Sequence, residues 1–291
     1  MNTVIECQNY RANEAIPAVE HRRSVVTRTR GVTRGPITRL VSPSDIGQLI
    51  KPFVFLDYGV SPASKAKLFG MHPHSGIATL SLPIKGEILF LDTTGETGVV
   101  KTAGLEWMKA GKGVWHDGGI AGEAALEMFQ LWVALPEHEE NSAAQSQNID
   151  PSEIAVVGPV SVLLGAYQGA KSPIEFTAGV NYYHVQLKNG EVWHYQPEPG
   201  QTVAWLALYR GNLTGTATVS QGEMVVFDAS ETAISLMAQQ GAASFVFGAA
   251  IPHPYPLVMG SYSVHTSRAA LAKGEQEIQR IGTELHLKGQ I

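Results

Sequence analysis

The chain has 291 residues, of which 44% are hydrophobic and 16% charged, a balance typical of folded globular proteins with room for about two domains. Its formal net charge of −5 leaves no basic domain that could neutralise phosphates, so we expect no direct nucleic-acid binding. Cys7 is the only cysteine, which excludes an intramolecular disulfide, and no apolar stretch is long enough to span a membrane. These features predict a cytoplasmic protein that does not enter membranes.

The amino-terminal part of the chain combines a loose start with strand-like segments. Residues 1–20 are expected to form a leader or an early edge element. Several arginines follow between positions 22 and 39, but the alternation over residues 25–30 favours a strand with a solvated face over a basic binding surface. The apolar run at residues 52–57 predicts a buried strand.

The segment from residue 70 to residue 119 contains three histidines among predicted strands. Strands are expected over residues 77–84, 87–91, 105–108 and 114–116, with an apolar strand at residues 128–135 after them. On a strand, His72 and His74 would point to the same face, and a meander could return His116 beside them. Three neutral imidazoles that converge in this way suit a divalent transition metal.

The same segment resembles the pirin family. The resemblance rests on HPHSGIAT at 72–79, KGE at 85–87, WMKAGKG at 107–113, His116 and QLWV at 130–133, and weaker similarity spans most of the chain. It implies an all-β fold of two consecutive cupin barrels, each a double-stranded β-helix or jelly roll, with a short C-terminal helix. It also implies metal ligands at His72, His74 and His116. The metal expected is iron, with zinc, copper, nickel or manganese as alternatives.

One position departs from the family pattern. In pirins a glutamate two residues after the third histidine also binds the metal, and here that position is Gly118. Strand alternation would turn the adjacent Asp117 away from His116 unless the glycines form a bulge. The expected ligands are therefore three histidines, with solvent or another side chain in the remaining positions, and the alternative is a site too weak to retain metal. The nearby carboxylates to inspect for substitution are Glu106, Glu123 and Glu127.

A polar segment divides the chain into two predicted units. Residues 136–152 are acidic and free of aromatic residues, so we expect an exposed connector there. The His-Glu-Glu cluster at 138–140 is expected to be a solvated charge run rather than a metal site. The predicted domains are residues 1–135, which hold the metal site, and residues 153–291, a degenerate second cupin with a tail.

The second unit repeats features of the first. Gly86 and Gly104 have counterparts in Gly211 and Gly222 at similar offsets, which predicts two copies of one barrel. No histidine stands at the equivalent ligand positions, so the second barrel is expected to be structural or to form a lid. An Asn-Gly turn at 189–190 predicts a hairpin of residues 182–187 and 191–195. Ser267 caps a predicted helix over residues 267–280, which in pirins returns to the first barrel.

The resemblance leaves three functional hypotheses open. The first is a metal-dependent, quercetinase-like dioxygenase that opens the heterocycle of a flavonol with molecular oxygen, without the proton acceptor that the missing glutamate supplies in pirins. The second is a non-catalytic or redox-sensing regulatory protein that binds a transcription factor or a metabolic enzyme. The third is a pirin fold whose site has decayed. A small aromatic substrate is expected for the first, and a protein partner for the second.

Overall fold

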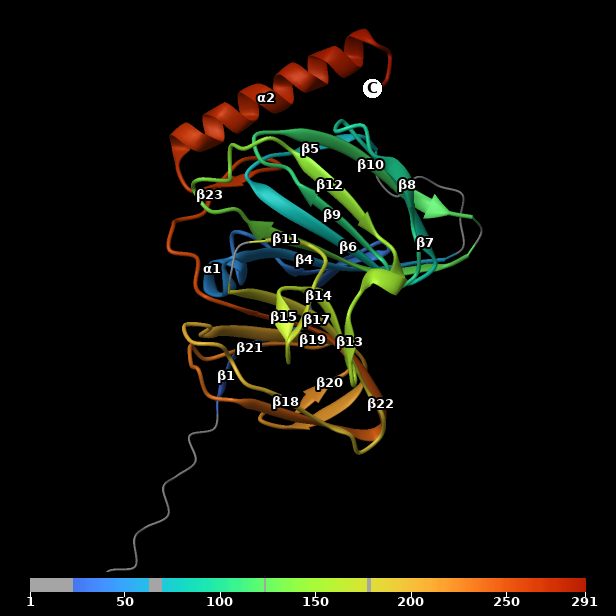
Figure 1. Ribbon diagram of the computed structural model, residues 1–291, viewed down its shortest axis with the longest axis vertical. Helices are drawn as coiled ribbons and strands as arrows, with labels where there is room; N and C mark the ends of the chain where they lie inside the picture. The colour runs from blue at the N-terminus through green and yellow to red at the C-terminus, as the bar shows by residue number, and fades with distance from the viewer. Residues whose placement is uncertain (1–22, 63–69, 123, 177–178) are drawn as a thin grey trace, which may run out of the picture.

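The structure is a computed structural model that describes residues 23–62, 70–122, 124–176 and 179–291. The predicted leader at residues 1–20, Cys7 and Glu123 therefore lie outside the described residues. The described chain consists mainly of strands, with a helix near the C-terminus, as predicted (Figure 1). No described helix combines the length and the apolar character that a membrane crossing needs.

The first barrel consists of two facing antiparallel sheets. A seven-stranded sheet has the order β12-β9-β6-β11-β4-β3-β2, and a four-stranded sheet has the order β5-β10-β7-β8. The strands are β2 (Val32–Arg34), β3 (Ile37–Val41), β4 (Phe53–Ser61), β5 (His72–His74), β6 (Ile77–Lys85), β7 (Glu87–Asp92), β8 (Thr97–Val100), β9 (Leu105–Lys109), β10 (Val114–Ala121), β11 (Leu126–Ala134) and β12 (Gln145–Ile149). The strands predicted between residues 77 and 135 are all present.

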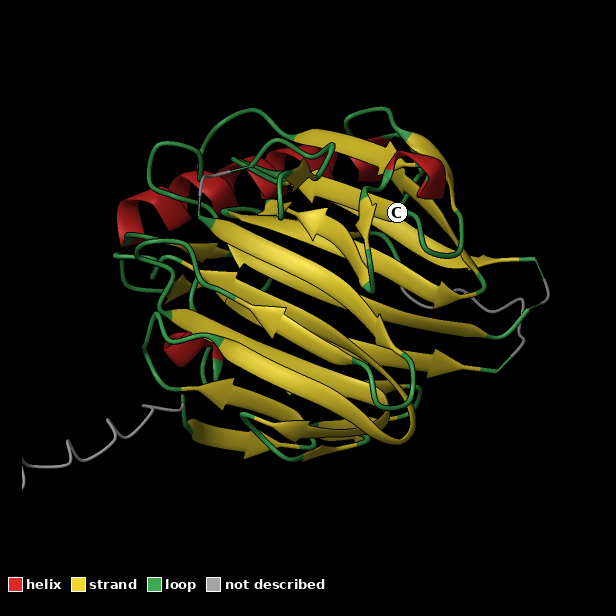
Figure 2. Cartoon of the chain, turned by 60° about the horizontal axis from the view of Figure 1, so that its bottom comes forward, coloured by secondary structure: helices red, strands yellow, loops and turns green. Residues whose placement is uncertain are grey.

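The second barrel is built on a nine-stranded sheet below the first (Figures 1 and 2). Its main path, β1-β21-β19-β22-β17-β14-β13, repeats the strand order of the seven-stranded sheet position by position, and β18 and β20 pair beside it. The strands are β1 (Val25–Thr29), β13 (Val156–Val157), β14 (Val160–Leu164), β17 (Val180–Leu187), β18 (Val192–Tyr195), β19 (Val203–Gly215), β20 (Val219–Ser220), β21 (Met224–Phe227) and β22 (Ile234–Ala250). This parallel confirms the prediction of two cupin barrels.

Equivalent glycines mark the repeat. Gly86 and Gly211 both have positive φ angles, 76° and 81°. A Cβ atom at Gly86 would lie 2.6 Å from the carbonyl oxygen of Ala125, and one at Gly211 would lie 2.1 Å from that of Ala242. Glycine is needed at both places because the chain bends tightly against the backbone of the neighbouring strand.

Two edge strands cross the predicted domain limits. β1, from the amino-terminal region, pairs with β21 of the second sheet. β12, from the predicted connector, pairs with β9 of the first sheet, so this segment is not only an exposed loop. The strand predicted near residues 25–30 is present, but its partner lies in the other barrel. The limits at residues 135 and 153 stay a prediction.

The predicted hairpin at 182–195 is wrong in its pairing. Both strands exist and Gly190 turns with a φ of 78°, but β17 pairs with β14 and β22, while β18 pairs with the other half of β22. Among the described residues no ladder joins β17 to β18. The 17-residue β22 is long enough to take both strands as neighbours, which overrides the local turn signal.

A large core joins the two barrels, and the long helix covers the first. Phe53, Trp107 and Phe129 of the seven-stranded sheet pack with Tyr182 and Trp205 of the second sheet. The remaining short elements are α1 (Gly47–Ile50), a 3-10 helix (Pro151–Glu153), and the ladders β15 (Ala166–Tyr167) with β16 (Ala170–Lys171) and β23 (Val258–Met259) with β24 (Val264–His265). Helix α2 (Arg268–Leu287) begins at the predicted Ser267 cap and lies over β5 and β10 (Figure 1).

Candidate metal centre

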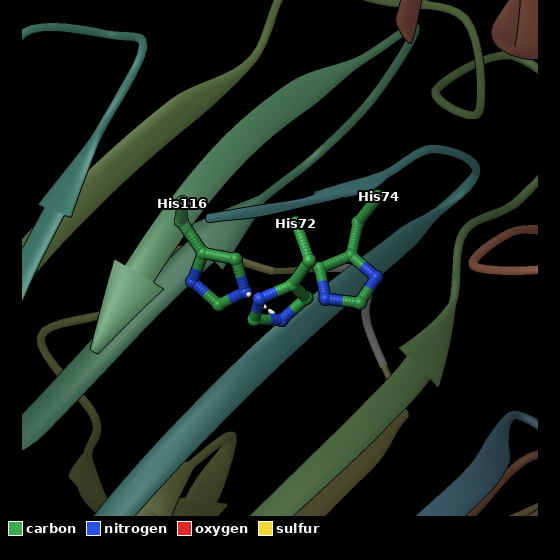
Figure 3. Close-up of side chains that lie close together, drawn as sticks. All are labelled: His72, His74 and His116. Carbon is green, nitrogen blue, oxygen red and sulfur yellow. Dashed lines mark hydrogen bonds between the residues drawn. The ribbon is translucent and has the colours of Figure 1, made fainter. Parts of the chain in front are cut away.

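The three predicted histidines lie together inside the first barrel. Strands β5 and β10 pair without a bulge, with His72 opposite His116 and His74 opposite Val114. The Nε2 atoms of His72 and His116 are 2.9 Å apart, and one ring nitrogen from each histidine lies within 4.8 Å of the other two. Figure 3 shows the three rings converging, with His72 between the others. This is the one such cluster in the described chain.

Backbone carbonyls fix the orientation of two of the rings. Nδ1 of His72 lies 2.8 Å from the Gly70 carbonyl oxygen, and Nδ1 of His74 lies 3.0 Å from that of Tyr262. Because a carbonyl only accepts, each Nδ1 carries the proton and each Nε2 offers its lone pair to the centre. Burial lowers the pKa of His74 well below its ordinary value, and burial followed by the proximity of His116 lowers that of His72. Burial therefore disfavours the protonated form of both rings.

The chemistry of the three donors and the spacing of His72 and His116 fit a transition metal. Two nitrogen ligands at a right angle around an ion, each about 2.1 Å from it, lie about 3 Å apart, which matches the 2.9 Å between His72 and His116. Three neutral imidazoles suit zinc, copper, iron and nickel. His74 is buried and His116 is 9% exposed, whereas His72 is half-buried.

No side chain replaces the missing glutamate at its own position. A Cβ atom at Gly118 would meet only the carbonyl oxygen of Leu89, at 3.6 Å, and one at Gly119 would meet nothing within 4 Å. β10 keeps a regular register, so Asp117 aligns with Leu91 on the opposite face from His116. The space beside His116 on the cavity side is therefore open.

Of the three carboxylates singled out from the sequence, Glu106 is the one that faces the cluster. Glu127 accepts a hydrogen bond from the Tyr58 hydroxyl at 2.6 Å, and Glu123 lies outside the described residues. Oε1 of Glu106 is 3.9 Å from Nδ1 of His116, and its Oε2 accepts a hydrogen bond of 2.7 Å from Ser81. Burial raises the pKa of Glu106, but its interactions with His116 and Ser81 outweigh burial and leave the pKa lowered.

Comparison with known proteins places the chain in a family. The sequence model of the Pirin family matches residues 35–133. A Pseudomonas aeruginosa protein named "Putative quercetin 2,3-dioxygenase" is 30% identical over 224 residues, which cover 70% of this chain and 76% of that protein. This chain is a member of the pirin family.

Solved structures agree on the fold of this pirin. A quercetin 2,3-dioxygenase from Acinetobacter baumannii superposes with a TM-score of 0.81 at 23% identity, covering 89% of this chain and 97% of that one. The bacterial pirin YhhW from Escherichia coli, in complex with nickel(II), gives a TM-score of 0.60 at 19% identity, covering 76% and 94%. At these identities the similarity establishes the fold alone.

The histidine cluster of this pirin opens into a cavity of about 640 Å³, large enough for a small aromatic molecule. Its apolar wall includes Phe55 and Trp132, whose rings stack with centroids 4.0 Å apart and planes 8° apart. The Arg39 guanidinium lies 3.9 Å from the centroid of the Phe55 ring and is paired with Asp57. Trp132 also contacts the ring of His74, at 4.8 Å between centroids.

The polar floor of the cavity is one row of cross-strand neighbours. Register pairs connect Glu106 to Ser81, Ser81 to Gln130, Gln130 to Asp57 and Asp57 to Arg39 across β9, β6, β11, β4 and β3. Strand alternation sends the next residues, such as Trp107, to the other face and into the core between the barrels. The strand predicted at 105–108 already indicated that Glu106 faces the cavity side. It stands between Leu105 and Trp107, which point to the opposite face and into the core.

A buried hydrogen-bonded clasp that the sequence did not reveal ties the tail to the site. The Ser75 hydroxyl lies 3.0 Å from Nε2 of His265, and Nδ1 of His265 lies 3.0 Å from Oε2 of Glu140. Glu140 also accepts hydrogen bonds from the backbone N–H and the hydroxyl of Thr266, at 2.7 and 2.6 Å. Since Glu140 is 1% exposed, the expectation of a solvated charge run at 138–140 is wrong for this residue. The clasp fixes the segment that carries Tyr262, whose carbonyl orients His74.

Proposed function

We propose that this pirin is a metal-dependent dioxygenase of the quercetinase type, with His72, His74 and His116 as its metal ligands and a flavonol-like aromatic molecule as its substrate. The observation that carries the proposal is the convergence of three imidazoles at the wall of an aromatic-lined cavity. The family relationship to a protein named as a quercetin dioxygenase supports the substrate class. Iron is the metal we expect, with zinc, copper, nickel or manganese as alternatives.

Different residues would bind the substrate and orient the metal ligands. A bound transition metal would supply a Lewis acid with open positions for oxygen chemistry. The Trp132 ring gives the cavity wall an aromatic surface for a planar substrate, while Phe55 is stacked on Trp132 and has the Arg39 guanidinium over its own ring. The carbonyls of Gly70 and Tyr262 hold two imidazoles in the tautomer that can bind an ion.

The test measures oxygen consumption by metal-loaded protein. The purified protein is stripped of metal, reloaded in separate samples with Fe(II), Zn(II), Cu(II), Ni(II) or Mn(II), and mixed with quercetin in aerated buffer. We expect oxygen uptake with a matching loss of flavonol absorbance for at least one metal, and loss of both activity and bound metal in His74→Ala. The control is His194→Ala, because His194 lies in the second barrel and contacts Ser235.

Two results would contradict different parts of the proposal. Protein that holds metal but consumes no oxygen with any of the five metals would remove the dioxygenase and leave a metal-binding pirin. Protein that binds no transition metal after reloading would remove the metal centre itself.

A further inference from the structure

The outward-facing nitrogens of His72 and His74 each contact an acceptor, that of His116 lies near one, and the three acceptors differ in charge. His72 and His74 face the neutral carbonyls of Gly70 and Tyr262, whereas Nδ1 of His116 faces the carboxylate of Glu106. The distance of 3.9 Å to Oε1 is about 1 Å beyond a hydrogen bond. When Nε2 of a neutral His116 binds a metal, Nδ1 carries the proton, and Oε1 of Glu106 is the acceptor on that side.

Glu106 is poorly explained as a purely structural residue. It is 4% exposed, and Oε1 has no hydrogen-bond partner among the described residues, although Ser81 donates to Oε2. A buried carboxylate is costly unless a positive charge lies nearby. The ion pairs of the described chain give Glu106 neither a lysine nor an arginine, only His116. The positive charge that would balance it is therefore that of the occupied centre.

The carboxylate lies outside the cluster rather than within it. The group of ring nitrogens within 4.8 Å of one another contains the three histidines and does not include Glu106. Oε1 approaches the Nδ1 side of His116, whereas the Nε2 side faces His72. On the cavity side, Gly118 leaves open space where a glutamate side chain would otherwise stand.

We propose that Glu106 is the positioning residue of the metal centre, which orients His116 and supplies from outside the ligand shell the negative charge that Gly118 cannot provide. This inference rests on the proposed metal site and deepens it. Three neutral imidazoles around a divalent ion would carry a net charge of about 2+, and each nearby carboxylate lowers it; Glu106 and Asp117 both act on His72, but Glu106 is the one that also lies beside a ring nitrogen of His116. Glu106 would contribute this charge without occupying the space that Gly118 leaves open on the cavity side.

The test compares Glu106→Gln with Glu127→Gln in the full-length protein. Glutamine keeps the size of the side chain and an acceptor for Ser81 but removes the charge. Glu127 undergoes the same chemical change while its partner is Tyr58 rather than a histidine. Zn(II) affinity is measured by competition with a chelator, and the Co(II)-substituted proteins are compared by their visible absorption spectra. We expect Glu106→Gln to weaken Zn(II) binding about 10- to 100-fold and to shift the Co(II) spectrum, and Glu127→Gln to match the wild type.

Two further variants separate positioning from general loss of structure. Adding Gly118→Glu to Glu106→Gln should restore Zn(II) affinity, because it returns a carboxylate to the centre where the structure has room. Ser81→Ala keeps the charge but frees the carboxylate, so we expect a smaller loss of affinity, and this variant also tests the inference if Glu106→Gln does not fold. Equal affinity and an unchanged spectrum in Glu106→Gln would overturn the role of Glu106 while leaving the metal centre intact. Wild-type protein that binds no metal would instead overturn the proposed function.

Discussion

Removal of the Glu140 side chain should cost this pirin substantial stability. Its buried carboxylate accepts three hydrogen bonds, one from His265 and two from Thr266. Glu140→Ala would leave three buried polar groups without their acceptor. Hydrogen bonds to a charged group are each worth about 1.5–3 kcal/mol, and breaking a buried charged contact from one side costs about 3–5 kcal/mol. We therefore expect the free energy of unfolding to fall by about 4 kcal/mol.

Urea unfolding followed by circular dichroism measures this loss, with Glu139→Ala as the matched control. Glu139 is the adjacent residue, but its carboxylate lies 3.5 Å from the Lys109 ammonium and is partly exposed, so its removal should cost less than about 1 kcal/mol. Tryptophan fluorescence adds a local signal, because Trp115 donates a hydrogen bond to the Ile278 carbonyl of helix α2. A loss in Glu140→Ala no larger than that in Glu139→Ala would show that the clasp does not hold the tail.

Two other predictions concern the second barrel. Burial lowers the pKa of His184 to about 4 from its ordinary 6.5. Because the unfolded chain binds this proton at a higher pH than the folded chain does, the free energy of unfolding falls as the pH drops from 6.5 towards 4. Between pH 7 and 5 the loss from this group is about 2 kcal/mol. His184→Gln should reduce the pH dependence of urea unfolding by that amount, and an unchanged dependence would refute the assignment. Gly211→Ala should lower thermal stability far more than Gly158→Ala. Both glycines have positive φ angles, but of the two only Gly211 would bring a Cβ atom against neighbouring backbone. Equal losses in the two variants would contradict the close approach of Gly211 to the backbone of Ala242.

The strands and the histidine cluster were predictable because their signals are local. Alternation and turn residues located the strands from 77 to 135, and the spacing of His72 and His74 put both rings on one face. The antiparallel pairing of β5 with β10 then brings His116 opposite His72. The repeat of glycines likewise revealed two barrels, since Gly86 and Gly211 occupy equivalent bends against neighbouring strands.

What the sequence did not predict depends on partners that are distant in the chain. β1 and β12 each join a sheet whose other strands lie far away in sequence, so composition alone cannot say which barrel they complete. The burial of Glu140 was unpredictable for the same reason. Its charged neighbours in the sequence indicate an exposed residue, and its partners His265 and Thr266 come from the C-terminal tail, far away in the chain. In the same way, the pairing of β17 and β18 with β22 overrode a strong local turn signal.

The choice among the three nearby carboxylates illustrates the same limit at the site itself. In the sequence, glycine at position 118 indicates the loss of a metal ligand. The distances of Glu106 and Glu127 from this position along the chain do not show which of them lies near the histidines. The fold of the barrel distinguishes the two. Strand β9, two strands from β11, places Glu106 beside Ser81 on the cavity floor and near His116. A carboxylate supplied from the facing sheet can balance the charge of the centre without occupying a metal position. On the proposed role of Glu106, the departure from the family pattern would be a relocation of charge, and a metal bound by the three histidines would be more accessible from the cavity.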